Sequence, residues 1–136
     1  MKYLRTYEDL SSDETSEIRD IISDITASLV DIGLKINLQI QTDVWSLTPK
    51  IIVYIIAKSY KLNDVIYEVD HLVSKFYSIG HPLISSRYRL YNNYGTPNWV
   101  DIFDNEIEHT QQDSIFDSKD LDLDTDIEAL ELIFER

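Results

Sequence analysis

The sequence of 136 residues contains no cysteine and only three glycines and three prolines. Without cysteine there can be no disulfide framework and no thiolate metal site, which fits a reducing compartment. Because glycine and proline are scarce, loops should be short and helices and strands regular. No apolar run approaches the ~20 residues that a membrane span requires, and the first residues lack a secretory signal. We therefore expect a cytoplasmic protein of one domain with no membrane partner.

Basic residues are also few, and the acidic ones are unevenly placed. The chain has 12 Lys and Arg against 25 Asp and Glu, which gives a net charge of −13. Residues 92–136 hold thirteen acidic and two basic side chains, so this region alone has a net charge of −11. This contrast predicts a nearly neutral folded body followed by an acidic extension. The negative charge disfavours nucleic acid as a partner.

Two segments of the chain repeat the same order of helix, glycine and strand. In each, apolar residues recur at three- and four-residue spacing until a glycine, Gly33 or Gly80, which predicts an amphipathic helix. Asn63 is the expected N-cap of the second helix. After each glycine the pattern changes to alternation of polar and apolar residues, which predicts strands over residues 34–41 and 84–91.

Between these repeats, residues 51–57 are continuously apolar and mostly β-branched, as in a strand at the centre of a sheet. The expected order is therefore helix, strand, strand, helix, strand. Stacking both helices on one face of the sheet buries all the apolar stripes. We predict an α+β, two-layer domain over residues 12–92, with two helices on one face of a small, mainly antiparallel sheet. Residues 1–11 would form an N-terminal arm, and residues 93–136 an acidic extension ending in a short amphipathic helix.

The most motif-like stretch is Asp120–Glu131, with the sequence DLDLDTDIEALE. It resembles a calcium-binding EF-hand loop at the acidic positions one, three, five and twelve. Position six, however, is Thr125, where that family needs the positive φ of glycine. The same residues fit a helix capped by Thr125 and Glu128. We favour the capped helix and expect no metal and no cofactor. Its apolar stripe would consist of Ile127, Leu130, Ile133 and Phe134.

The sequence contains no recognisable catalytic pattern. The three histidines, His71, His81 and His109, share no ligand spacing. A nucleophile elbow, a phosphate-binding loop and a dinucleotide-binding glycine pattern are all absent. Carboxylate pairs are abundant, but in so acidic a segment they say little about acid/base chemistry. We expect a protein that is not an enzyme, with a small enzyme of unrecognised type as an alternative.

Arg87 and Arg89 precede a turn-rich segment that contains Tyr91, Tyr94 and Trp99. Cations beside aromatic rings can bind single-stranded nucleic acid by stacking. The same rings can instead close the open edge of a core. The overall negative charge favours the second interpretation.

The first ten residues, MKYLRTYEDL, resemble the opening of many short uncharacterised proteins of tailed bacteriophages. The resemblance implies a phage origin and a small accessory role, and it brings no catalytic residues with it. Within this segment Tyr3, Leu4, Tyr7 and Leu10 form a short apolar stripe among charges.

The sequence predicts a core with no recognisable site, flanked by two amphipathic segments, residues 3–10 and 127–134. This organisation suggests a non-enzymatic protein-interaction protein, a phage-type accessory or virion-associated component. In an alternative hypothesis, the acidic extension imitates nucleic-acid phosphate and inhibits a host or defence protein. A tail that only keeps the protein soluble is a third possibility. The expected partner-binding residues are Ile127, Leu130, Ile133 and Phe134 of the terminal helix, with Tyr3 and Tyr7 of the arm.

Overall fold

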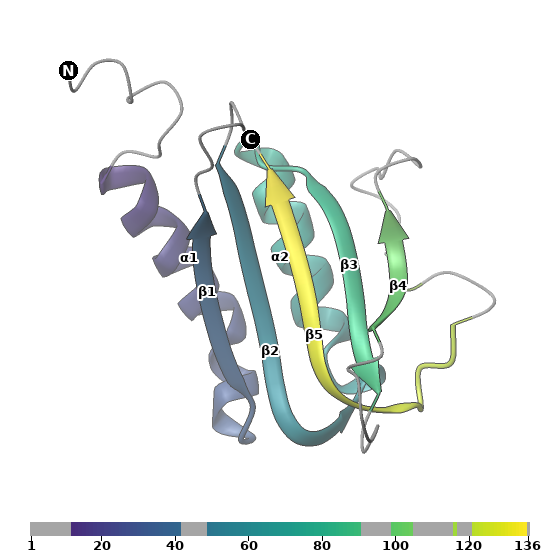
Figure 1. Ribbon diagram of the computed structural model, residues 1–136. Helices are drawn as coiled ribbons and strands as arrows, with labels where there is room; N and C mark the ends of the chain where they lie inside the picture. Colours follow the sequence, from purple (N-terminus) through teal and green to yellow (C-terminus); the bar gives the residue numbers. More distant parts are fainter. Residues whose placement is uncertain (1–11, 42–48, 91–98, 105–115, 117–120, 136) are drawn as a thin grey trace.

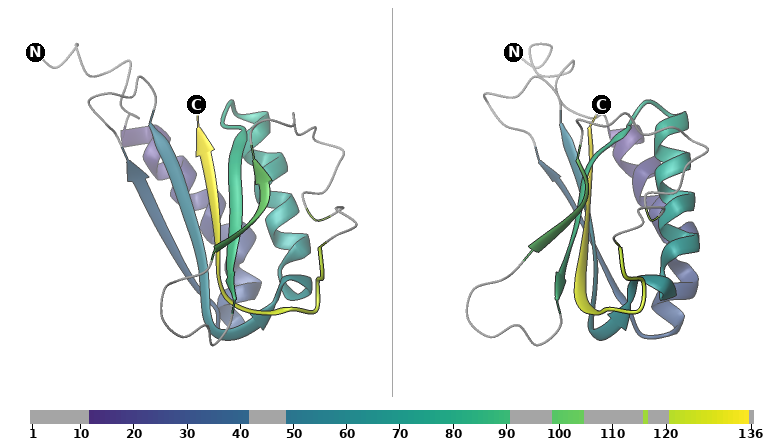
Figure 2. Two further views of the ribbon diagram at one scale, coloured as in Figure 1. Left: turned by 45° about the vertical axis from the view of Figure 1, so that its right-hand side comes forward. Right: turned by 90° about the vertical axis from the view of Figure 1, so that its right-hand side faces the viewer.

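The computed structural model describes residues 12–41, 49–90, 99–104, 116 and 121–135. These residues form two layers, a five-stranded sheet and two α-helices stacked on one of its faces (Figure 1). The elements are α1 (Ser12–Asp31), β1 (Lys35–Gln41), β2 (Lys50–Lys61), the 3-10 helix η2 (Leu62–Asp64), α2 (Ile66–Ser78), β3 (Leu83–Leu90), β4 (Trp99–Asp104) and β5 (Asp126–Glu135). The predicted α+β class and element order are confirmed, and the helices lie on one side of the sheet (Figure 2). No helix in the described ranges is long and apolar enough to cross a membrane.

β5, the last strand in the chain, lies in the middle of the sheet. The strand order is β1-β2-β5-β3-β4, and every neighbouring pair is antiparallel. β2 and β3 therefore run parallel to each other with β5 between them, and α2 connects them in a split β-α-β unit. The sheet is continuous only because β5 bonds to both β2 and β3.

The predicted terminal helix over residues 127–134 is therefore wrong. Its apolar residues also contain a strand alternation, Leu130, Leu132 and Phe134, and all three are fully buried against the helices. Two neighbouring strands supply partners for the backbone of β5, which outweighs the helical spacing and the capping residues. Ile127 is buried as well, whereas Ile133 is half-buried on the opposite face of the strand.

The predicted domain boundary at residue 92 fails for the same reason. β4 and β5 both lie beyond it, and without β5 neither β2 nor β3 has its inner neighbour. Residues 93–136 thus supply a central strand and an edge strand in addition to acidic side chains. The contrast in charge along the sequence does not coincide with a boundary of the fold.

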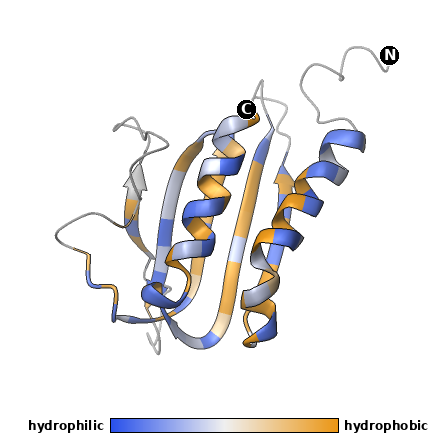
Figure 3. Ribbon diagram, turned by 180° about the vertical axis from the view of Figure 1, so that it is seen from behind, coloured by the Kyte–Doolittle hydropathy of each residue, from blue (hydrophilic) through white to orange (hydrophobic). Residues whose placement is uncertain are grey.

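The hydrophobic core lies between the helices and the sheet. Figure 3 shows hydrophobic and hydrophilic residues alternating around both helices, as expected for helices packed on one side. The ring of Phe76 on α2 packs edge-on against that of Phe134 on β5, with centroids 4.5 Å apart. The largest fully buried side chains come from every layer: Phe76, Phe134, Ile18, Leu29, Ile51, Ile55, Leu62, Leu72, Ile127, Leu130, Leu132 and Val53.

The two helix-ending glycines are confirmed, but the predicted N-cap is wrong. Gly33 and Gly80 have φ angles of 102° and 90°, the left-handed region that favours glycine. Asn63 does not cap α2, because η2 precedes that helix and Val65 occupies the N-cap position. The carboxylate of Asp64 instead accepts a hydrogen bond of 3.0 Å from the backbone N–H of Lys61.

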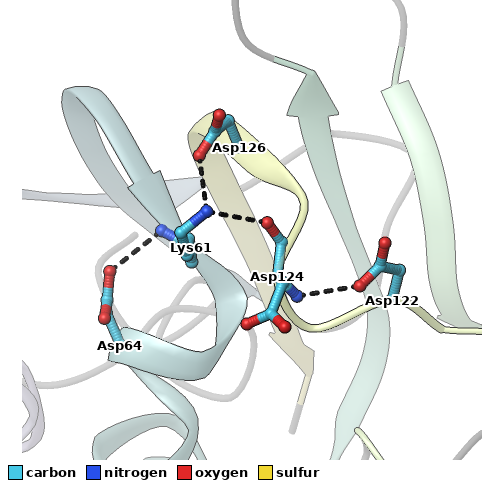
Figure 4. A network of polar contacts seen from close by, with 5 residues as sticks. All are labelled: Lys61, Asp64, Asp122, Asp124 and Asp126. Carbon is cyan, nitrogen blue, oxygen red and sulfur yellow. Dashed lines mark hydrogen bonds and ion pairs between the residues drawn. The ribbon is translucent and has the colours of Figure 1, made fainter.

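Lys61 fixes the point at which the chain enters β5. Its ammonium group donates to the carbonyl oxygen of Asp124 at 2.9 Å and to the carboxylate of Asp126 at 3.0 Å (Figure 4). The hydrogen bond to Asp126 raises the pKa of Lys61. Asp122 closes the turn, since its Oδ1 accepts a hydrogen bond of 3.0 Å from the N–H of Asp124. These exposed contacts contribute little stability singly, but together they join the end of β2 to the start of β5.

Candidate functional site

The face of the sheet that points away from the helices carries a polar row across all five strands. The successive cross-strand partners are Asn37, Tyr54, Glu131, Arg87 and Asp101, from β1, β2, β5, β3 and β4. Directly opposed residues point to the same face of a sheet. This row is the first cluster to consider as a site.

Glu131 forms the centre of that row and is already neutralised. Its side chain is only 4% exposed, and its carboxylate accepts hydrogen bonds from Arg87 Nε at 2.6 Å and Nη2 at 3.3 Å. The hydrogen bond to Glu131 raises the pKa of Arg87. Burial, followed by a hydrogen bond to Glu131, raises the pKa of Tyr54. This arrangement holds a buried charge by pairing it, which is a structural role for both residues.

Trp99 stacks with two arginines at the β4 side of the same face. The guanidinium carbons of Arg87 and Arg89 lie 4.6 Å and 5.5 Å from the centroid of its ring. Arg89 also forms an ion pair of 2.7 Å with Glu128. Each guanidinium group therefore has a carboxylate partner, which leaves little positive charge for phosphate. The sequence suggested arginines beside aromatic rings, and Arg87 and Arg89 do stack on Trp99. This contact joins β3 to β4 at the edge of the sheet.

The β1 edge has a different character. β1 pairs with β2 over its seven residues without a register shift, and no described strand lies on its other side. Alternate residues of an edge strand point their N–H and C=O groups away from the sheet. β1 contains no proline, and Lys35 at its first position is its single charged residue. Apart from Lys35, the described residues of β1 include no proline, bulge or further charge of the kind that protects a sheet edge from pairing.

A groove of about 800 Å³ runs between β1 and α1. Ile22, Thr26 and Leu34 are the buried residues of its lining, and Ile36 and Leu38 contribute half-buried aliphatic side chains from β1. The hydroxyl of Thr26 donates to the carbonyl oxygen of Ile22 at 2.6 Å, so this buried polar group is already satisfied. The remaining lining residues are Arg19, Ser23, Ala27, Val30, Asp31, Lys35 and Asn37.

The groove is one of the less acidic parts of the molecule. Its charged residues are Arg19, Asp31 and Lys35, a net charge of +1 in a chain of −13. Val30 in its wall is 54% exposed, so its aliphatic side chain is available for contact. An edge strand, a groove of mixed aliphatic and polar lining and an exposed valine thus lie together on one side of the molecule. We call this combination the β1 edge site.

The partner-binding residues expected from the sequence do not form a surface. Ile127, Leu130 and Phe134 are in the core, and Ile133 lies in the central strand. Tyr3 and Tyr7 lie outside the described residues.

The resemblance to an EF-hand loop fails at position twelve, because Glu131 is paired with Arg87 in the middle of β5. In the described ranges no three potential metal ligands gather. Of the histidines, His71 is exposed, His81 is buried near the ring of Phe76, and His109 is outside those ranges.

Comparison of the chain with protein-family models, curated proteins and solved structures gives no match.

Proposed function

We propose that this protein is a non-enzymatic protein-interaction protein that binds its partner at the β1 edge site. One observation carries the proposal: β1, with no described strand on its outer side, lies directly beside a groove whose lining is half aliphatic and half polar. Backbone groups along β1 offer hydrogen bonds, and Ile36, Leu38 and Val30 offer apolar area that a partner would remove from water. Each buried 100 Å² of such area is worth about 2.5 kcal/mol before the costs of association.

The setting that we propose is a phage-type accessory or virion-associated role in a host cytoplasm. The resemblance of residues 1–10 to the opening of tailed-phage proteins supports it. A protein partner fits the surface better than nucleic acid does, because the groove carries a net charge of only +1 and Arg87 and Arg89 are paired with carboxylates.

Peptide selection from a random library on the immobilised full chain tests the proposal, with a matched pair of variants. Val30 in the last turn of α1 and Ile32 just after the helix are both exposed aliphatic residues, at 54% and 65%, but only Val30 lines the groove. We expect Val30→Glu to reduce binding of the selected peptides about tenfold or more, since it places a charge in an apolar contact. Ile32→Glu should leave binding unchanged. Selected peptides that ignore Val30→Glu would place the binding surface elsewhere and overturn the proposal.

A further inference from the structure

The form of the partner follows from the backbone groups on the outer side of β1, where no described strand lies. Along β1, alternate residues present a backbone donor and acceptor outward at a regular spacing. A partner helix satisfies its own backbone internally and could not bond to these groups. Only an extended chain offers donors and acceptors at the matching spacing. The backbone of the edge therefore favours a strand over a helix.

The position of α1 also favours a single added strand. In Figure 1 the N-terminal half of α1 lies beyond β1, outside the edge of the sheet. A strand placed beside β1 would lie over the helix. Its inward side chains next to the first part of β1, up to Leu38, would enter the groove, which on the helix side is lined mainly by the C-terminal half of α1. The residues of α1 that line the groove between Ile22 and Val30 would cover those side chains on the helix side of the sheet.

A second copy of this chain fits the same edge poorly. Antiparallel pairing of β1 with its own copy would require a two-fold axis beside β1. That axis would put the first helix of the copy in the same layer as α1. The two helices would then compete for the same space at the edge (Figure 1). The net charge of −13 on each copy adds long-range repulsion. A segment of another protein, without a helix attached at that place, avoids both obstacles.

We infer that the β1 edge site accepts an extended segment of a partner protein as a sixth strand, antiparallel to β1, with alternate apolar side chains in the groove. This inference rests on the proposed function and specifies its ligand. All four existing strand pairs are antiparallel, and that pairing is the more stable per residue. The segment's residues opposite Ile36 and Leu38 should be apolar, and those opposite Asn37 and Gln39 should be polar and uncharged.

The test uses a synthetic probe, acetyl-Ser-Val-Thr-Ile-Thr-Val-Ser-amide, and the full chain. Two further probes carry backbone N-methyl groups on the odd or on the even residues of the same peptide. An added strand directs only alternate N–H groups toward β1, so one methylated probe should lose about tenfold or more in affinity and the other should retain it. A scrambled peptide, in which the apolar residues are adjacent, should bind weakly. Fluorescence anisotropy with labelled probes measures all four affinities.

Several outcomes would overturn strand addition. Equal effects of the two methylation patterns, or tighter binding of a helical peptide with apolar residues at three- and four-residue spacing, would show that the edge backbone is not used. Dimerisation of the free chain with protection of the β1 amides would assign the edge to a second copy. If library-selected peptides still depend on Val30 in any of these cases, the proposed function stands and only strand addition fails. If they do not, both fail.

Discussion

The two edge strands of the sheet, β4 and β1, differ in how readily they could pair with a further strand. β4 is six residues long, and its pairing with β3 shifts register between Ser86 and Arg87. It also carries Asp101 and Trp99 beside the arginines of β3. β1 pairs over seven residues without a shift and has a single charge at its end. Irregular pairing and charge discourage further strands, whereas a regular neutral edge invites them. The difference is the reason that we place the proposed binding site at β1 and not at β4.

Both edges depend on the central strand, and removing it should have the largest effect. A chain that ends after Thr125 lacks β5, so β2 and β3 lose their common neighbour and the core loses Leu130 and Phe134. We expect the loss of the whole folding free energy, typically about 5–15 kcal/mol. Circular dichroism should then show no cooperative thermal transition. A cooperative transition near that of the full chain would mean that residues up to 125 fold alone.

A smaller change in the same strand separates its two faces. Phe134→Ala removes a fully buried ring that contacts Phe76 and should cost about 3–5 kcal/mol of unfolding free energy. Ile133→Ala, one residue away on the half-buried face, should cost less, about 1–2 kcal/mol. Chemical denaturation of both variants measures the difference. Equal costs would contradict the assignment of the core to the helix side.

Replacing Glu131 should weaken the β4 side and spare the β1 edge site. Glu131→Gln keeps the size of the side chain but removes the charge that pairs with Arg87. Because Arg87 is 39% exposed, water can compensate in part, and we expect a cost of about 1–3 kcal/mol. Affinity for the strand probe should be unchanged when the variant is folded. A loss of probe binding by this variant would show that the two edges are coupled.

Alkaline pH should weaken the fold through buried tyrosine. Burial raises the pKa of Tyr60 far above its ordinary value of 10.0, and its hydroxyl donates to the carbonyl oxygen of Ile55. The unfolded chain releases this proton near pH 10 and the folded chain does not, so the stabilising effect is complete below pH 10 and is lost as pH rises above it. The expected loss is about 1 kcal/mol per pH unit. Melting temperatures from pH 9 to 11 for the parent and Tyr60→Phe should converge if this tyrosine is responsible.

The sequence predicted the helices and the first three strands because each has a strong local period. It did not predict β5, because Leu130 and Phe134 fit a helical stripe as well as one face of a strand, and only the gap between β2 and β3 decides between them. The β1 edge site was missed for a related reason. The residues of β1 were correctly placed on a strand, but strand order determines which strand is an edge, and local sequence does not encode that order.

The Arg87–Glu131 pair shows how sequence distance hides a contact. The two residues are 44 positions apart, and the local sequence relates Arg87 to a stacking surface and Glu131 to a pattern that resembles a calcium loop. The antiparallel register of β3 and β5 brings them face to face. The polar Glu131 between the apolar Leu130 and Leu132 follows the alternation of a strand, and this is the signal that could have revealed β5.

Amide hydrogen exchange of the full chain, with and without saturating strand probe, tests the central claim most directly. If the probe adds to the sheet at β1, exchange should slow at alternate residues between Lys35 and Gln41, because those N–H groups become hydrogen-bonded. Exchange along β4 should not change. Slowed exchange at β4, or binding of the probe without any change along β1, would contradict the claim that β1 is the binding edge.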